Sequence, residues 1–262
     1  MRLHISSPLP GQLFYIDETG RMPALRFEAG LLDGNQQLLK TPLQWVLQIA
    51  ENVWPGACPN AKIGRQVINL QGMSMGLGNW IPSFNAICGG DATLSVSADY
   101  LGEVYRATVN FRIRGKNPSP EAVLDRLGGE NSAMARLGRY LSGLKQFDMQ
   151  GMPYLGENGE VGIMQLCDLG ARQPQRWSWV HNIDTAKAMM QRLQGSAKAY
   201  LDQHRFGGSY PNNQSLSDAG VLLREMLQRF LGGAYWQWGE QELQWRRNPP
   251  DNTVDELLRR DD

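Results

Sequence analysis

The chain has 262 residues, of which 42% are hydrophobic and 20% are charged. These proportions are typical of a globular protein with one large domain or two modest ones, rather than of a disordered chain. The 26 basic and 26 acidic residues give a formal net charge of zero. Because no global field of one sign results, we expect neither nucleic acid nor an anionic membrane as a partner.

The N-terminal stretch "MRLHISSPLPGQLFYIDETG" contains prolines and polar residues where a signal peptide needs an apolar region. No stretch approaches eighteen consecutive apolar residues, so we expect no membrane insertion. The sequence therefore predicts a protein that is made in the cytoplasm without a Sec signal.

Three cysteines, Cys58, Cys88 and Cys167, lack the spacing of metal ligands, which favours buried or free thiols and predicts no metal site. A Cys58–Cys88 bridge stays open, and it would need an oxidising compartment. Cys167 stands next to Asp168, but no histidine follows at a recognisable spacing. The sequence is therefore a poor match for a cysteine nucleophile.

The N-terminal part, up to about Gly115, shows a period of two. In "PLQWVLQIA" apolar residues alternate with glutamines, and "TLSVSADYLGEVYRATVNFRIRG" alternates on both sides of Leu101-Gly102. This pattern predicts an antiparallel hairpin with one solvated face. Together with "MPALRFEAGLL" and the Gly-Pro-Asn-rich connections, it predicts a small Ig-like antiparallel β-sandwich.

The period changes after "KNPSPEAVLDRL", where Ser119 can cap a helix and Pro120 can occupy its first turn. The apolar spacing predicts helices over about 131–145 and about 182–203, and a third that begins with Ser217 as its cap and ends at Gly232-Gly233. The last fifteen residues, "NPPDNTVDELLRRDD", are predicted to be weakly ordered.

The most specific signal lies between the first two of these helices. "RYLSGLKQFD" is followed by the turn "GEVGIMQL" and then by "RWSWVHNID". This order resembles the glycan-binding core of goose-type lysozymes and soluble lytic transglycosylases, in which a helix ends in Glu-Ser and a Gly-Leu-Met-Gln or Gly-Ile-Met-Gln run follows. More closely, it resembles a branch in which an all-β domain precedes a lysozyme-like domain, associated with type VI-like toxin delivery in bacteria.

The resemblance implies an α+β protein with a β-sandwich domain over residues 1–116 and an α-helical lysozyme-like domain over 117–262. It implies no cofactor. The partners that it implies are peptidoglycan glycan strands or a protein, such as a secretion-system component or an immunity protein, after export to a periplasm by a contact-dependent system. Six residues are expected to bind substrate: Ser142, Gln146, Met164, Gln165, Phe230 and Trp236.

The chain departs from this family at the decisive position. A glycosidic oxygen leaves only when it is protonated, so the site needs a carboxylic acid that an apolar pocket keeps neutral. Aligning Ser142-Gly143 with the family's Ser-Gly places the general acid at Leu141, and leucine cannot transfer a proton. A Tyr-Asn pair of the family is likewise replaced by Phe230 and Leu231.

We therefore interpret Leu141 as a core leucine, in one apolar stripe with Met134, Leu137 and Leu144. The hypothesis that we favour is a degenerate glycosidase that binds glycan or a protein partner. Whether the chain is an enzyme stays open.

Two alternatives remain. Glu157, Glu160 or Asp168 can be substitutes for the missing acid in an active muramidase or transglycosylase, although solvated loop acids of ordinary pKa are the simpler interpretation. A non-enzymatic adaptor of a secretion assembly is the other. The tryptophans at 177, 179, 236, 238 and 245 can stack on sugars, but core packing is the more common role.

Overall fold

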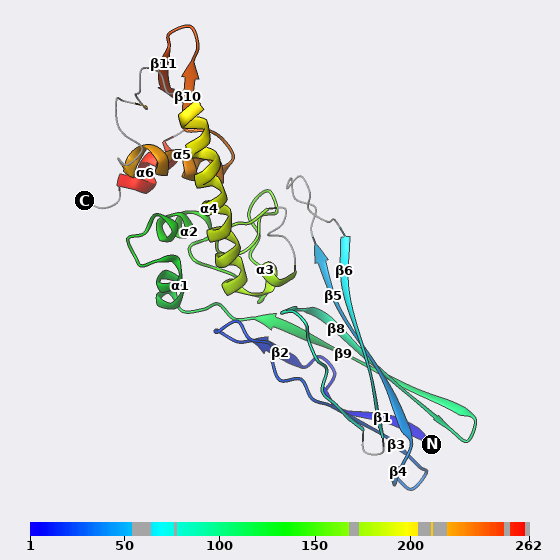
Figure 1. The fold of residues 1–262 in the computed structure, drawn as a ribbon. Coiled ribbons are helices and arrows are strands. Elements are labelled where there is room, and N and C mark those ends of the chain that lie inside the picture. Colours follow the sequence, from blue (N-terminus) through cyan, green and yellow to red (C-terminus); the bar gives the residue numbers. More distant parts are fainter. Residues whose placement is uncertain are drawn as a thin grey trace. The chain divides into compact units, whose positions relative to one another are not determined.

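The computed structural model describes residues 1–53, 64–75, 78–167, 173–203, 211, 219–248 and 252–259. It is a mixed α+β structure (Figure 1). The residues group into two compact units, of which the first comprises Met1–Val123 and Leu141–Asn182 and the second comprises Leu124–Tyr140 and Ile183–Asp262. The segment after the second helix thus belongs with the sheets. The two domains expected from the sequence, 1–116 and 117–262, remain a prediction.

The strands of the first unit, in chain order, are β1 (Arg2–Ser7), β2 (Leu13–Ile16), β3 (Phe27–Leu32), β4 (Leu38–Leu39), β5 (Pro42–Val53), β6 (Gly64–Met75), β7 (Gly78–Trp80), β8 (Gly90–Tyr100) and β9 (Glu103–Gly115). The helices and the last hairpin are α1 (Pro120–Leu127), α2 (Ala133–Ser142), α3 (Gln173–Trp177), α4 (Trp179–Gln203), α5 (Ala219–Leu231), β10 (Trp236–Gly239), β11 (Gln244–Arg247) and α6 (Thr253–Arg259).

The larger sheet has the order β2-β9-β8-β5-β6. Its alternation is as predicted, since Leu43, Trp45, Leu47 and Ile49 of β5 are all buried. The predicted hairpin joins β8 to β9 through Leu101 and Gly102, whose φ angles are 54° and 82°. A turn with two positive φ angles matches the twist of its strands, which is why a Gly suits its second position.

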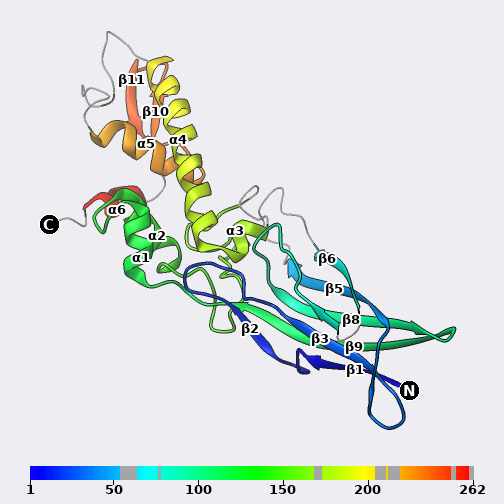
Figure 2. The same ribbon diagram turned by 60° about the horizontal axis from the view of Figure 1, so that its bottom comes forward.

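The second sheet has the order β1-β3-β4, with β7 paired to β3, and it shares one core with the larger sheet (Figure 2). Phe27 of β3 contacts Phe111 of β9 with ring centroids 5.6 Å apart. The prediction of purely antiparallel sheets is wrong at one place, because β2 runs parallel to β9. Alternation specifies which face of a strand is buried but does not specify its direction.

The predicted helices are present with shifted ends. Ser119 caps α1 through a bond from the Ala122 N–H to its Oγ, 3.2 Å long. The helix predicted over 131–145 ends earlier, at Ser142, because Gly143 and Leu144 adopt φ angles of 62° and 64°. The helix predicted over 182–203 begins earlier, at Trp179, and Ser217 lies outside the described residues.

Two features of the C-terminal part differ from expectation. The tail is not entirely weakly ordered, since α6 buries Val254, Asp255 and Leu257. The hairpin β10–β11 adds strands to a region expected to be helical. The alternation of residues in "YWQWGEQELQW" is the sequence pattern that indicates these two strands. No helix within the described ranges has the length and apolarity required to cross a lipid bilayer.

Candidate functional site

The end of α2 is the centre of the candidate site. Leu141 is half-buried in the last turn of this helix, and Ser142 is buried. The Ser142 hydroxyl donates a 2.8 Å hydrogen bond to the carbonyl oxygen of Ile163. The helix end is therefore bonded to the "GIMQL" turn, and Leu141, the residue beside the serine, has no proton to transfer.

Gln146 connects this turn to α3. Its side chain is completely buried, and its Nε2 donates to the carbonyl oxygens of Gln175 and Arg176 at 3.0 and 2.8 Å. Its Oε1 accepts a 3.3 Å bond from the Ile163 N–H. Since buried amides are stable only when they are bonded, Gln146 holds the backbone of two segments together.

Asn182, in the first turn of α4, also joins the backbone of this turn to that of α3. It is completely buried, and its Oδ1 accepts a 2.9 Å bond from the Met164 N–H. Its Nδ2 donates to the carbonyl oxygens of Val161 and Gln175 at 2.9 and 3.2 Å. We call Ser142, Gln146 and Asn182 the polar frame of the turn Val161–Leu166.

The second residue of this turn, Gly162, occupies a position where only a glycine fits. Its φ is 73°, and a Cβ at this position would approach Asn182 Nδ2 and Gln146 Oε1 to 2.5 and 2.6 Å. From the sequence we expected the glycine-rich turn to allow close approach of a sugar. In the structure the groups that approach Gly162 are the two amides of the polar frame.

The predicted binding residues of this segment lie at different depths. Ser142, Gln146 and Met164 are buried, so they support the turn from within the first unit. Gln165 is half-buried, has a φ of 46° and donates from Nε2 to the Gly162 carbonyl oxygen at 2.7 Å. Gln165 is thus the only one of these four that is partly accessible to a ligand.

The predicted substitute acids do not share the position of Leu141. Glu157 is exposed at the tip of the turn that joins Leu155 to Val161. Glu160 is half-buried, and its carboxylate accepts bonds from the backbone N–H and the side-chain amide of Asn158, both 3.0 Å long. Asp168 lies outside the described residues.

The remaining predicted residues belong to the second unit. Phe230 is half-buried in α5, and Trp236 is buried. The Trp236 indole donates a 3.1 Å bond to the Val221 carbonyl oxygen, which makes it a core residue rather than a platform for sugars. Trp177 and Trp179 are buried as well, as the more common role of tryptophan predicts.

A buried ion pair anchors α3, and nothing in the sequence pattern indicated it. Arg176 contacts Glu51 of β5 through Nε at 2.6 Å, and the Trp177 indole donates to the other Glu51 oxygen at 2.6 Å. Arg176 and Glu51 are 3% and 1% exposed. In the sequence, this pair is visible only as a single Glu in the apolar strand "WVLQIAENV". Its partner Arg176 lies 125 positions away, so no local pattern connects the two residues.

The cysteines correct one alternative. Cys88 is a buried free thiol, so the Cys58–Cys88 bridge does not form. Burial, together with the Glu51 carboxylate, raises the pKa of the Cys88 thiol to about 12. Cys167 is disulfide-bonded, so the expectation of free thiols is wrong at this position, and Cys167 has no thiol to act as a nucleophile. Cys58 lies outside the described residues.

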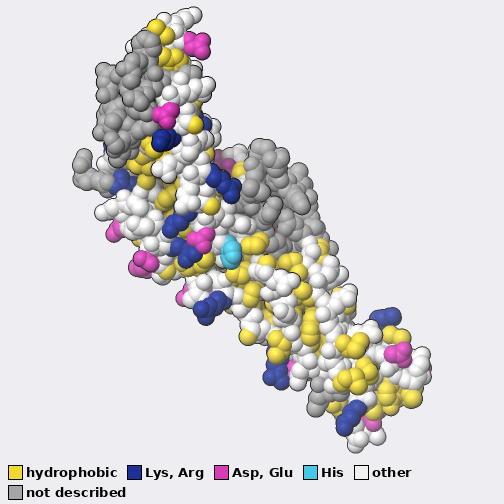
Figure 3. Space-filling view, viewed as in Figure 1, with side chains coloured by type: hydrophobic (Ala, Val, Ile, Leu, Met, Phe, Trp, Pro, Cys, Tyr) yellow, Lys and Arg dark blue, Asp and Glu magenta, His cyan; other side chains and the backbone are white. Residues whose placement is uncertain are grey.

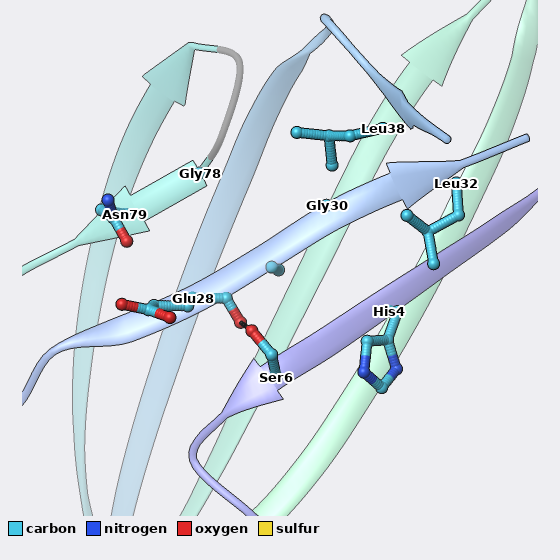
Figure 4. Close-up of a pocket in the computed structure, with 9 residues that line it drawn as sticks. His4, Ser6, Glu28, Gly30, Leu32, Leu38, Gly78 and Asn79 are labelled. Atoms are coloured by element: carbon cyan, nitrogen blue, oxygen red, sulfur yellow. Dashed lines mark hydrogen bonds between the residues drawn. The ribbon is translucent and has the colours of Figure 1, made fainter. Parts of the chain in front are cut away.

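Two surface features complete the description. A shallow hollow of about 310 Å³ on the smaller sheet contains polar side chains such as His4, Glu28 and Asn79 and the apolar Leu32 and Leu38 (Figure 4). None of the predicted site residues lines it. On the face seen in Figure 3, basic and acidic side chains are scattered and form no field of one sign.

The chain matches no protein-family model, and a search of curated proteins finds no match to it. Its function is therefore inferred from its residues and their contacts.

Proposed function

We propose that this chain is a peptidoglycan-directed, lysozyme-like protein that binds glycan strands without cleaving them. The observation that carries this proposal is the combination of Leu141 at the end of α2 with a complete polar frame behind it. Buried side chains support the turn, whereas the side chain at position 141, at the end of α2, has no group that could protonate a glycosidic oxygen.

The chemistry of the neighbouring acids supports binding over catalysis. A general acid needs an apolar pocket that raises its pKa and a position within hydrogen-bond reach of the glycosidic oxygen. Glu157 is exposed, and the carboxylate of Glu160 is occupied by Asn158 within its own turn. Neither glutamate lies at the end of a helix.

The expected location is a periplasm, reached through a contact-dependent, type VI-like secretion system. The disulfide at Cys167 supports this proposal, because disulfides form and persist in oxidising compartments. The partners proposed for this setting are glycan strands first, and a component of the secretion assembly or an immunity protein second.

The decisive experiment compares the wild type with Leu141→Glu on purified peptidoglycan. Release of soluble muropeptides measures cleavage, and co-sedimentation with the insoluble sacculi measures binding. We expect the wild type to sediment with the sacculi and to release nothing, and Leu141→Glu to gain cleavage. Tyr140→Glu is the matched control, since it adds the same carboxylate one residue earlier, at a side chain that is 53% exposed.

The other outcomes identify the other functions. Cleavage by the wild type that is lost in Glu157→Gln or Glu160→Gln would establish an active muramidase or transglycosylase. A wild type that does not sediment with sacculi would contradict glycan binding and favour the adaptor of a secretion assembly.

A further inference from the structure

The strand β6 forms an edge of the larger sheet. It pairs with β5 over its whole length, from Gly64 to Met75, and no other described strand pairs with it. Figures 1 and 2 show β6 on the outer side of β5 in both views. In an antiparallel pair about half of the backbone N–H and C=O groups point away from the neighbour, so β6 presents a row of them outward.

Within the described residues, the strand β6 itself lacks the features that normally prevent strands from associating. Proteins protect edges with lysines, prolines, bulges or very short strands. The strand β6 has twelve residues, its register with β5 is unbroken, and "GRQVINLQGMSM" contains no proline and only one charged residue, Arg65. A strand of this kind is suited to pairing with another strand.

Apolar side chains are exposed along the same edge. Val67, Met73 and Met75 are 41%, 68% and 73% exposed. On the opposite face of the strand, Ile68 and Leu70 pack against the core but remain half-buried. An added strand would cover both sets, which gives pairing an apolar contribution in addition to the backbone bonds.

We propose that β6 is the interface at which two copies of this chain pair, antiparallel, about a two-fold axis at Leu70. The order of residues in the strand is self-complementary about this position. The two-fold operation places Val67 opposite the partner's Met73, and Asn69 opposite the partner's Gln71. Apolar residues thus meet apolar residues, and an amide meets an amide.

The inner face of the pair is complementary too. Leu70 meets its own copy, and Ile68 lies opposite the partner's Gly72, whose missing side chain is replaced by the indole of Trp80 packed against it. No like charges oppose each other between Val67 and Met73, because these seven residues are uncharged. A two-fold interface is self-complementary by definition, and this strand satisfies that condition. The result is a continuous sheet across both copies.

The first test is the oligomeric state of the full chain by sedimentation equilibrium. We expect a dimer whose fraction rises with protein concentration. The double variant Asn69→Lys/Gln71→Lys sets like charges opposite each other across the axis, and it should weaken dimerisation by roughly tenfold or more. The matched control is Gln44→Lys/Gln48→Lys, which adds two lysines to exposed positions of the adjacent strand β5.

A second test fixes the register. In Leu70→Cys the two introduced thiols face each other at the axis, so a short bifunctional maleimide should link the dimer. In Met73→Cys the thiol faces the partner's Val67 and should not be linked. Circular dichroism confirms that each variant is folded.

The proposal is overturned if the wild type is a monomer at all concentrations, if the edge and control lysines act alike, or if Met73→Cys links as well as Leu70→Cys. These outcomes are independent of glycan binding. A chain that dimerises through β6 but does not bind sacculi would contradict only the proposed function.

Discussion

Two regions of the molecule hold a turn in place with buried polar side chains, but they use different chemistry. In the first unit, the amides of Gln146 and Asn182 bond the turn Val161–Leu166. In the second unit, the buried carboxylate of Glu225 accepts bonds from the backbone N–H groups of Tyr235 and Trp236, both 2.9 Å long. The groups that bond the first turn directly are neutral amides, and the group that bonds the second is a carboxylate.

The charged region extends to a second carboxylate. Asp255 accepts bonds from the Tyr235 hydroxyl and from Arg224 and Arg247, at 2.7, 3.2 and 3.0 Å. Burial acts to raise the pKa of Asp255, but these three donors outweigh burial, so its pKa lies below the ordinary value. The comparison teaches that the turn Val161–Leu166 is bonded directly by amides, which do not titrate, whereas the C-terminal region is bonded directly by carboxylates.

Glu225→Ala should have the largest effect. It removes the acceptor of two buried N–H groups and leaves Arg229, which contacts Glu225 at 2.7 Å, without its partner. Breaking a buried ion pair costs about 3–5 kcal/mol, and we expect that loss in the free energy of unfolding measured in urea. Glu240→Ala, an exposed acid of the same unit, is the control and should be nearly neutral.

Asn182→Ala tests the neutral region. The buried Met164 N–H loses its bond to Oδ1, and the Val161 carbonyl oxygen keeps only its 3.0 Å bond from the Leu166 N–H, which should cost about 2–3 kcal/mol. Urea unfolding and the hydrogen exchange of the Met164 amide measure the effect. Asn158→Ala at the exposed tip of the preceding turn is the control. A loss as small as that of the control would show that the polar frame does not support the turn.

Lowering the pH should destabilise the C-terminal region before it destabilises the turn Val161–Leu166. The lowered pKa of Asp255 contributes stability above its unfolded value of about 3.8, and this contribution is lost as the pH falls through the folded pKa. Below about pH 4 the amides near Tyr235 should therefore lose exchange protection before the Met164 amide does. Loss of protection in the reverse order would contradict the comparison.

Gln165→Ala should have the smallest effect on stability. Its side chain contributes one bond, to the Gly162 carbonyl oxygen at 2.7 Å, worth about 1 kcal/mol. Because Gln165 is the accessible residue of the turn, its removal should weaken co-sedimentation with peptidoglycan more than it weakens folding. The exposed Gln150 provides the control, Gln150→Ala, and equal binding by both variants would remove Gln165 from the binding site.

Local patterns were sufficient for much of the fold. Alternation identified β5 and the hairpin β8–β9, and Ser119-Pro120 marked the start of α1. The parallel pairing of β2 with β9 was not predicted, because strand direction depends on the path of the chain between sheets. The helix α6 was missed since its apolar residues are few, and its order comes from contacts such as those of Asp255.

Some features of the candidate site are likewise determined by the sequence, and others only by the tertiary structure. The absence of an acid at Leu141 is a property of the sequence, because no fold gives leucine a proton to transfer. The depth of Gln146, the role of Asn182 and the pair of Glu51 with Arg176 were decided by the tertiary structure. A residue's chemistry is fixed by its side chain, whereas its exposure and its partners depend on which distant segments fold against it.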